Sequence, residues 1–88
     1  MPIISYFFGI YIRMYHDDHN PPHIHVEYQG HEALLIISNA GILAGSLPNK
    51  AHKIVKEWMQ VHQEELQNDW QRAVRLEPLL RIAGADND

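Results

Sequence analysis

The hydrophobic and polar residues of this chain follow a strand-like pattern before Pro48 and a helix-like pattern after it. Before Pro48, apolar residues alternate with polar ones or form short blocks, as is typical of β-strands. After Pro48, apolar residues recur every three or four positions, which places them on one stripe of a helix. The chain is therefore expected to form an N-terminal sheet followed by a helical part.

The strand-like half predicts four strands, at residues 6–15, 23–28, 31–38 and 42–47. A loop is expected at residues 16–22, because Asn20 precedes a proline and such a residue disfavours helix. Gln29 and Gly30 are typical of a two-residue hairpin turn, and a second turn is expected at residues 39–41. Consecutive strands joined in this way run mostly antiparallel.

The helical half begins at Pro48, which suits the first turn of a helix because its missing N–H would be unsatisfied there anyway. The pattern predicts one helix over residues 48–75, or two helices that break near residues 62–63. Its stripe is apolar on one side only, so it should pack on one face of the sheet. The stripe consists of Ala51, Ile54, Val55, Trp58, Met59, His62, Leu66 and Trp70.

These elements predict an α+β fold: a small, mostly antiparallel four-stranded sheet with a C-terminal helix or helix pair on one face. With 88 residues, one domain over residues 1–83 is expected, with a disordered tail at 84–88. A short returning strand is expected at residues 79–82, after Pro78. The core of such a small domain is limited, so a homodimer would add useful burial.

Composition excludes several classes of protein. The chain has no cysteine, which excludes disulfides, thiolate catalysis and cysteine zinc sites. It has no run of about 18 apolar residues, so no membrane-spanning helix is expected. A cytoplasmic protein fits these features. The formal net charge of −4 means that contact with nucleic acid would need a local basic patch.

Candidate chemistry is concentrated in residues 15–31, which hold five of the seven histidines. His23 and His25 lie two apart on a predicted strand and should point to the same side, with Glu27 next in line. Two imidazoles and a carboxylate can bind zinc or another divalent metal where they converge. This metal hypothesis assigns as ligands Asp18, His19, His23 and His25.

A second hypothesis uses the same strand without a metal. Histidine titrates near neutral pH and serves as a general acid or base. An arginine can bind a phosphate bidentately, and tyrosines can stack on a base or donate a proton. The hypothesis is a metal-independent ribonuclease, with all its residues on one sheet face if the first two strands pair. Those residues are His23, His25, Arg13, Tyr11, Tyr15 and Glu27.

A third interpretation needs no catalysis. Histidine and aspartate side chains near a Pro-Pro corner also hydrogen-bond their own loop backbone, and a strand histidine also fits a solvated face. The chain would then bind a partner protein through residues 16–22 or through the lysine ridge of Lys50, Lys53 and Lys56. RNA chemistry, metal binding and partner binding all stay open at this point.

The order of the motifs resembles a known family. The matching segments read Met-Tyr-His-Asp-Asp-His-Asn-Pro-Pro-His-Ile-His-Val, Gly-Ser-Leu-Pro and Glu-Trp-Met-Gln-Val-His-Gln-Glu-Glu-Leu. From residue 2 to about residue 82, the chain is similar to the small bacterial proteins of domain-of-unknown-function family 4160. Ile24 stands where a phenylalanine is common in that family.

The resemblance implies a toxin-like protein of a two-protein toxin–antitoxin pair, with a small cognate antitoxin as its partner. The resemblance supplies no mechanism; together with the histidine-rich strand, it leads to the hypothesis of a toxin that acts on RNA or the translation apparatus. By position, the family signature falls on Asp18, His19, Pro21, Pro22, His23, His25, Trp58, His62, Leu66 and Trp70.

Overall fold

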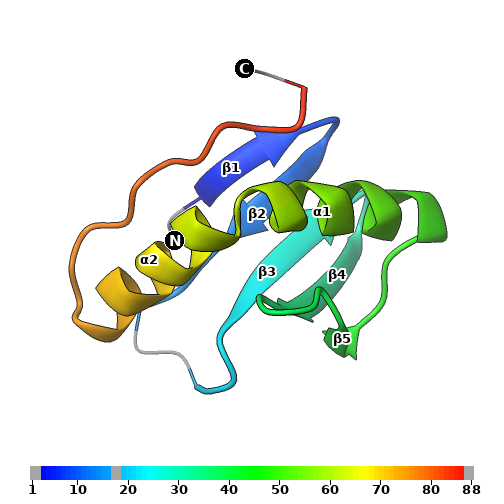
Figure 1. The fold of residues 1–88 in the computed structure, drawn as a ribbon. Helices are drawn as coiled ribbons and strands as arrows, with labels where there is room; N and C mark the ends of the chain where they lie inside the picture. The colour runs from blue at the N-terminus through cyan, green and yellow to red at the C-terminus, as the bar shows by residue number, and fades with distance from the viewer. Residues whose placement is uncertain (1–2, 17–18, 87–88) are drawn as a thin grey trace.

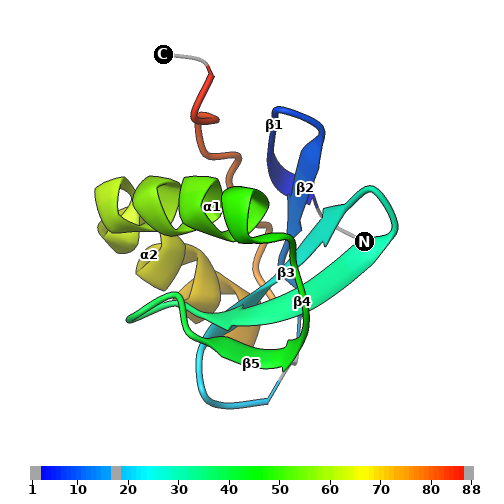
Figure 2. The ribbon, with the colours of Figure 1, turned by 90° about the vertical axis from the view of Figure 1, so that its right-hand side faces the viewer.

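The computed structural model describes residues 3–16 and 19–86 and shows an antiparallel sheet with two helices on one face (Figures 1 and 2). Five strands lie side by side in chain order: β1 (Ile3–Phe7), β2 (Ile10–Arg13), β3 (His23–Tyr28), β4 (His31–Ile36) and β5 (Ile42–Gly45). They are followed by α1 (Asn49–Val61) and α2 (Gln63–Val74). The expected α+β class is confirmed, but the expected four-stranded sheet is wrong.

The additional strand comes from residues 6–15, which were expected to form one strand and instead contain a hairpin. Phe8 and Gly9 form its turn with φ angles of 52° and 76°, and Tyr6 pairs with Tyr11 across it. Two successive positive φ angles are typical of the type I′ turn, whose twist matches that of paired strands. Phenylalanine rarely adopts a positive φ, so Phe8 gave no indication of a turn. The hydrophobic alternation also continues across residues 8 and 9, so a single strand was expected.

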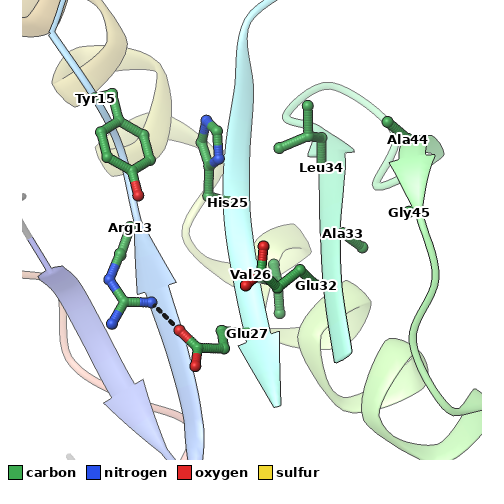
Figure 3. Close-up of a pocket in the computed structure, with 10 residues that line it drawn as sticks. All are labelled: Arg13, Tyr15, His25, Val26, Glu27, Glu32, Ala33, Leu34, Ala44 and Gly45. Carbon is green, nitrogen blue, oxygen red and sulfur yellow. Dashed lines mark hydrogen bonds and ion pairs between the residues drawn. The ribbon is translucent and has the colours of Figure 1, made fainter. Parts of the chain in front are cut away.

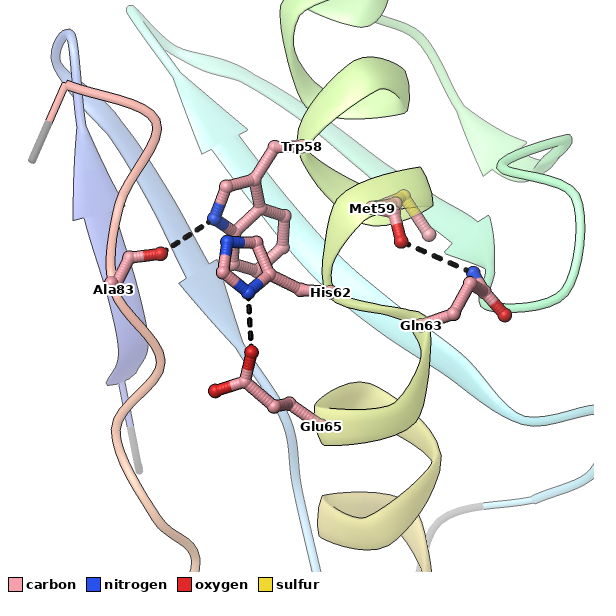
Figure 4. A network of polar contacts seen from close by, with 6 residues as sticks. All are labelled: Trp58, Met59, His62, Gln63, Glu65 and Ala83. Atoms are coloured by element: carbon pink, nitrogen blue, oxygen red, sulfur yellow. Dashed lines mark hydrogen bonds and ion pairs between the residues drawn. The ribbon is translucent and has the colours of Figure 1, made fainter. Parts of the chain in front are cut away.

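The helical half forms two helices, which was the second of the two alternatives. His62, with a φ of −109°, separates α1 from α2, and its Nδ1 lies 2.5 Å from Glu65 Oε1 (Figure 4). The side-chain amide of Gln63 donates hydrogen bonds to the carbonyl oxygens of Met59 (3.3 Å) and Ile37. The break is therefore tied to the loop that follows β4.

The core lies between the helices and the sheet face that they cover. Phe7 packs against Trp58 with ring centroids 5.0 Å apart, so β1 contacts α1 directly. Burying a large apolar side chain contributes roughly 1.5–3 kcal/mol each, which makes this layer the main source of stability. The buried apolar side chains on the sheet include Phe7, Ile10, Ile12, Ile24, Val26 and Leu35, and those on the helices include Ala51, Val55, Trp58, Met59, Leu66 and Trp70.

The segment after α2 returns along β1 but does not form the strand expected at residues 79–82. Its Ile82 N–H donates to the Ile4 carbonyl (2.7 Å), and its Leu80 N–H donates to Asp69 Oδ1 (3.0 Å). Trp58 Nε1 donates to the Ala83 carbonyl (2.8 Å). These contacts cover the β1 edge of the sheet. Residues 87–88 of the expected tail lie outside the described residues, and disorder of that tail stays a prediction.

Two glycines with positive φ provide a matched test of β5 packing. A Cβ on Gly45 (φ 79°) would lie 2.1 Å from the Glu32 carbonyl oxygen, whereas one on Gly30 (φ 84°) would meet nothing within 4 Å. Both alanine substitutions carry a left-handed strain of about 1–2 kcal/mol. Gly45→Ala should cost about 1–3 kcal/mol more in urea unfolding, because β5 must move away from β4. Equal losses would contradict this account of the β4–β5 contact.

Candidate functional site

The sheet face that the helices leave uncovered carries a shallow pocket of about 350 Å³ (Figure 3). Strand side chains alternate between the two faces, so the residues between the core positions of β2, β3 and β4 point into it. Its polar and aromatic lining comes from Arg13, Tyr15, His25, Glu27 and Glu32, and Leu34 and Ala44 add apolar surface.

Antiparallel register brings these side chains together. Arg13 lies opposite His25 between β2 and β3, and Glu27 lies opposite Glu32 between β3 and β4. Directly opposite residues have Cβ atoms about 4.5–5.5 Å apart, close enough for their side chains to interact. Arg13 Nη1 donates to Glu27 Oε1 at 2.6 Å, which fixes the guanidinium above the sheet.

Aromatic rings frame this ion pair. The Tyr15 ring meets the His25 ring edge-on, with centroids 4.3 Å apart, and its hydroxyl points toward Arg13 (Figure 3). On the other side, Arg13 Cζ lies 5.1 Å from the centroid of the Tyr11 ring. Five of the six residues assigned to RNA chemistry therefore lie together on one sheet face, as the strand pattern predicted.

The sixth residue, His23, turns inward. Its side chain is 3% exposed and its ring lies 5.4 Å from the Trp70 ring of α2. Its Nδ1 donates to the Pro21 carbonyl oxygen at 2.8 Å, since a carbonyl can only accept. The ring is still 5.2 Å from that of His25, so the two imidazoles are neighbours. Of the two, His25 is the one that lines the pocket.

The metal hypothesis is left without a ligand set among the described residues. Asp18 lies outside them, and His19 lies on the exposed loop before β3. Within residues 3–16 and 19–86, no three histidine, aspartate or glutamate side chains are grouped so that they could hold a metal ion. A centre built from Asp18, His19, His23 and His25 stays a prediction.

Sequence reasoning missed Tyr6 and Glu32. Tyr6 packs on Tyr11 with ring centroids 4.7 Å apart, on the same face as Arg13. The available signal was a mirror pattern around Phe8 and Gly9, in which a tyrosine on each side stands at the same distance from the turn. Glu32 was overlooked because its strand was judged by its apolar run alone.

With the geometry in place, the comparisons with known proteins give the family. The model of a family described as Domain of unknown function (DUF4160) matches residues 9–71. The chain belongs to this family. No curated protein and no solved structure matches it. The DUF4160 match runs from the hairpin turn through Trp70, and thus includes every pocket residue and the aromatic neighbour of His23.

One further finding concerns the helices of this DUF4160 protein. Neither α1 nor α2, the two helices within the described residues, is long and apolar enough to cross a membrane.

The different environments of the two histidines predict different effects on stability. His23→Ala should lower the free energy of unfolding by about 1–3 kcal/mol, because it removes a buried ring that packs on Trp70 and takes away the donor to the Pro21 carbonyl. His25→Ala should change it by no more than about 0.5 kcal/mol, as is usual for side chains outside the core. Urea unfolding followed by tryptophan fluorescence measures both. A larger loss for His25→Ala would contradict the assignment of His23 as the structural residue.

Proposed function

We propose that this protein is the toxin of a two-protein toxin–antitoxin pair and that it binds and cleaves RNA at the pocket on the uncovered sheet face. The observation that carries the proposal is the joint placement of His25, Tyr15 and Arg13 at one pocket. An acid–base group, a proton donor and a cation are what RNA cleavage without a metal requires. The family membership is compatible with this proposal and does not test it.

The chemistry assigns one step to each side chain. His25 takes the proton of a ribose 2′-hydroxyl, whose oxygen then attacks the adjacent phosphorus. Arg13 neutralises charge on the non-bridging phosphate oxygens. Tyr15 gives its proton to the departing 5′-oxygen as the P–O5′ bond breaks, which leaves a 2′,3′-cyclic phosphate. Transfer of the proton from His25 to Tyr15 restores both side chains.

Glu27 is a positioning residue in this scheme. Its carboxylate accepts the Nη1 hydrogen bond of Arg13, and the Arg13 side chain is 20% exposed. A guanidinium offers five N–H donors in a planar fork, so the contact with Glu27 leaves donors for a phosphate. Because the contact with Glu27 already restricts the Arg13 side chain, that side chain loses less conformational entropy when a phosphate binds.

The Glu32 carboxylate adds negative charge to the pocket and therefore repels an anionic ligand. The pocket contains one arginine and two glutamates, so with His25 neutral the lining carries a net negative charge. Glu32 lies on the β4 side, opposite Glu27. We infer that a phosphate approaches from the Tyr15 side, where Arg13 and His25 face it without an adjacent carboxylate of β4.

The assignment of His25 is tested by growth after induced expression. His25→Ala and Arg13→Ala should each relieve growth inhibition, since loss of an acid–base group typically lowers a rate about 10²- to 10⁴-fold. His31→Ala is the matched control, because that histidine is exposed at the start of β4 and outside the pocket. It should inhibit growth like the parent. Full inhibition by His25→Ala would overturn the assignment.

The charge of the pocket predicts a gain of affinity. Glu32→Gln should tighten binding of a non-cleavable 2′-O-methyl RNA about 1.5- to 5-fold, because partly exposed charges contribute roughly 0.2–1 kcal/mol. Fluorescence anisotropy at low ionic strength measures the change, and added salt should reduce it. Glu64→Gln, on the exposed surface of α2, is the control and should have no effect. A weakened complex with Glu32→Gln would argue against phosphate at this pocket.

The partner part of the proposal needs its own comparison. Expression of the chain alone should slow growth, and co-expression with the small protein encoded beside it should restore growth. If expression alone leaves growth unchanged and the two proteins co-purify, the chain is a non-enzymatic interaction protein instead.

A further inference from the structure

The uncovered sheet face continues beyond the pocket onto the β1–β2 hairpin. Tyr6 and Tyr11 are directly opposite each other there, with ring centroids 4.7 Å apart and ring planes inclined by 44°. Their exposed fractions are 48% and 37%, so much of each ring is open to solvent. The helices cover the opposite face of the hairpin, where Phe7 is buried. The pair is therefore an exposed aromatic surface on the face that also carries the pocket.

We propose that Tyr6 and Tyr11 form a stacking platform for an unpaired nucleobase, and that the ligand of this face is single-stranded RNA. The inference deepens the proposed function and rests on it for the identity of the ligand. A base on the platform would belong to a nucleotide next to the phosphate at Arg13. The platform would bind RNA whether or not the pocket cleaves it.

The order of side chains along the face supports this arrangement. The Tyr11 ring contacts the Tyr6 ring, and Arg13 Cζ lies 5.1 Å from the centroid of the Tyr11 ring. Arg13 in turn lies opposite His25, whose ring meets Tyr15. The aromatic rings proposed to bind bases are therefore next to the arginine proposed to bind the phosphate. That arginine is in turn next to the proposed acid–base pair.

The charges around the platform favour the same ligand. The residue opposite Tyr11 on β3 is Glu27, whose carboxylate is paired with Arg13 at 2.6 Å. The paired carboxylate repels a nearby phosphate less than an isolated one would. Stacking on an aromatic ring also depends little on charge, so it can support binding by a chain whose formal net charge is −4.

The platform selects single strands for a geometric reason. In a duplex, bases are stacked on each other and paired, and their faces are not available to a protein side chain. An unpaired base can be splayed out and stacked on tyrosine. The two rings cover a small area, so the face is suited to one or two bases rather than to a long strand.

Phe8 offers a matched control within the same hairpin. It is an exposed aromatic residue, 55% exposed, but it lies in the turn and lines a separate pocket together with Ile54, Trp58 and Val61 of α1. A substitution there changes exposed aromatic area without touching the uncovered sheet face.

The test is fluorescence anisotropy with a labelled eight-nucleotide 2′-O-methyl RNA, which cannot be cleaved because its 2′-hydroxyls are blocked. Tyr6→Leu and Tyr11→Leu should each weaken binding about 5- to 100-fold, as expected for loss of a base–aromatic stack. Tyr6→Phe and Phe8→Leu should bind like the parent. The same oligonucleotide in a duplex, or with abasic sites at its centre, should bind the parent at least about fivefold more weakly.

Several outcomes would overturn the platform: no binding of the oligonucleotide by the parent, equal binding of the intact and abasic oligonucleotides, or unchanged binding by Tyr6→Leu. If a leucine variant unfolds, the abasic and duplex comparisons on the parent still decide. Platform-dependent binding without growth inhibition would reject the proposed toxin function alone. Growth inhibition that needs His25, with binding independent of Tyr6, would reject the platform alone.

Discussion

The antiparallel register between β2 and β3 is the constraint on which the rest of the site depends. On the helix side it pairs Ile12 with Val26, both of which are buried, and on the other side it places Arg13 opposite His25. A slip by one residue would bring the charged side chains into the core and expose the apolar ones. Core burial therefore fixes the positions of Arg13, His25 and Glu27, although none of these three side chains belongs to the core.

The helices contribute to the site by what they leave uncovered. Both lie on one face of the sheet, and the segment after α2 returns along β1 instead of crossing the other face (Figures 1 and 2). Trp70 of α2 reaches His23 at the start of β3 and keeps that ring buried. Packing of the helices thus gives two neighbouring histidines different roles: His23 is structural, and His25 lines the pocket.

The uncovered face carries both positive and negative side chains in similar number, so its chemistry depends on individual contacts and not on a large net charge. The Arg13–Glu27 ion pair is only partly exposed, with side-chain exposures of 20% and 41%. Such a pair contributes little to stability, so its main effect is to hold the guanidinium in one orientation. An anion on this face would rely on that orientation, on His25 and on aromatic contacts more than on the field of the whole molecule.

Much of the fold and part of the site could be predicted from local patterns. The change of period at Pro48 gave the sheet and the helices in their order, and the two-residue period of β3 separated Ile24 and Val26 from His25 and Glu27. These predictions succeed because side-chain direction within one element follows from its own geometry. The hairpin at Phe8 was missed because its turn uses a residue that seldom adopts a positive φ.

The sequence by itself therefore determined which residues share a face within each element: Arg13 with Tyr11, and His25 with Glu27. Only the tertiary structure decided that His23 is buried and that Tyr6 lies beside Tyr11. The burial of His23 depends on Trp70, which is distant in the chain and is brought to β3 by helix packing. The placement of Tyr6 depends on where the chain reverses, and the reversal at Phe8 and Gly9 is the one that also places Phe7 against Trp58 of a distant helix.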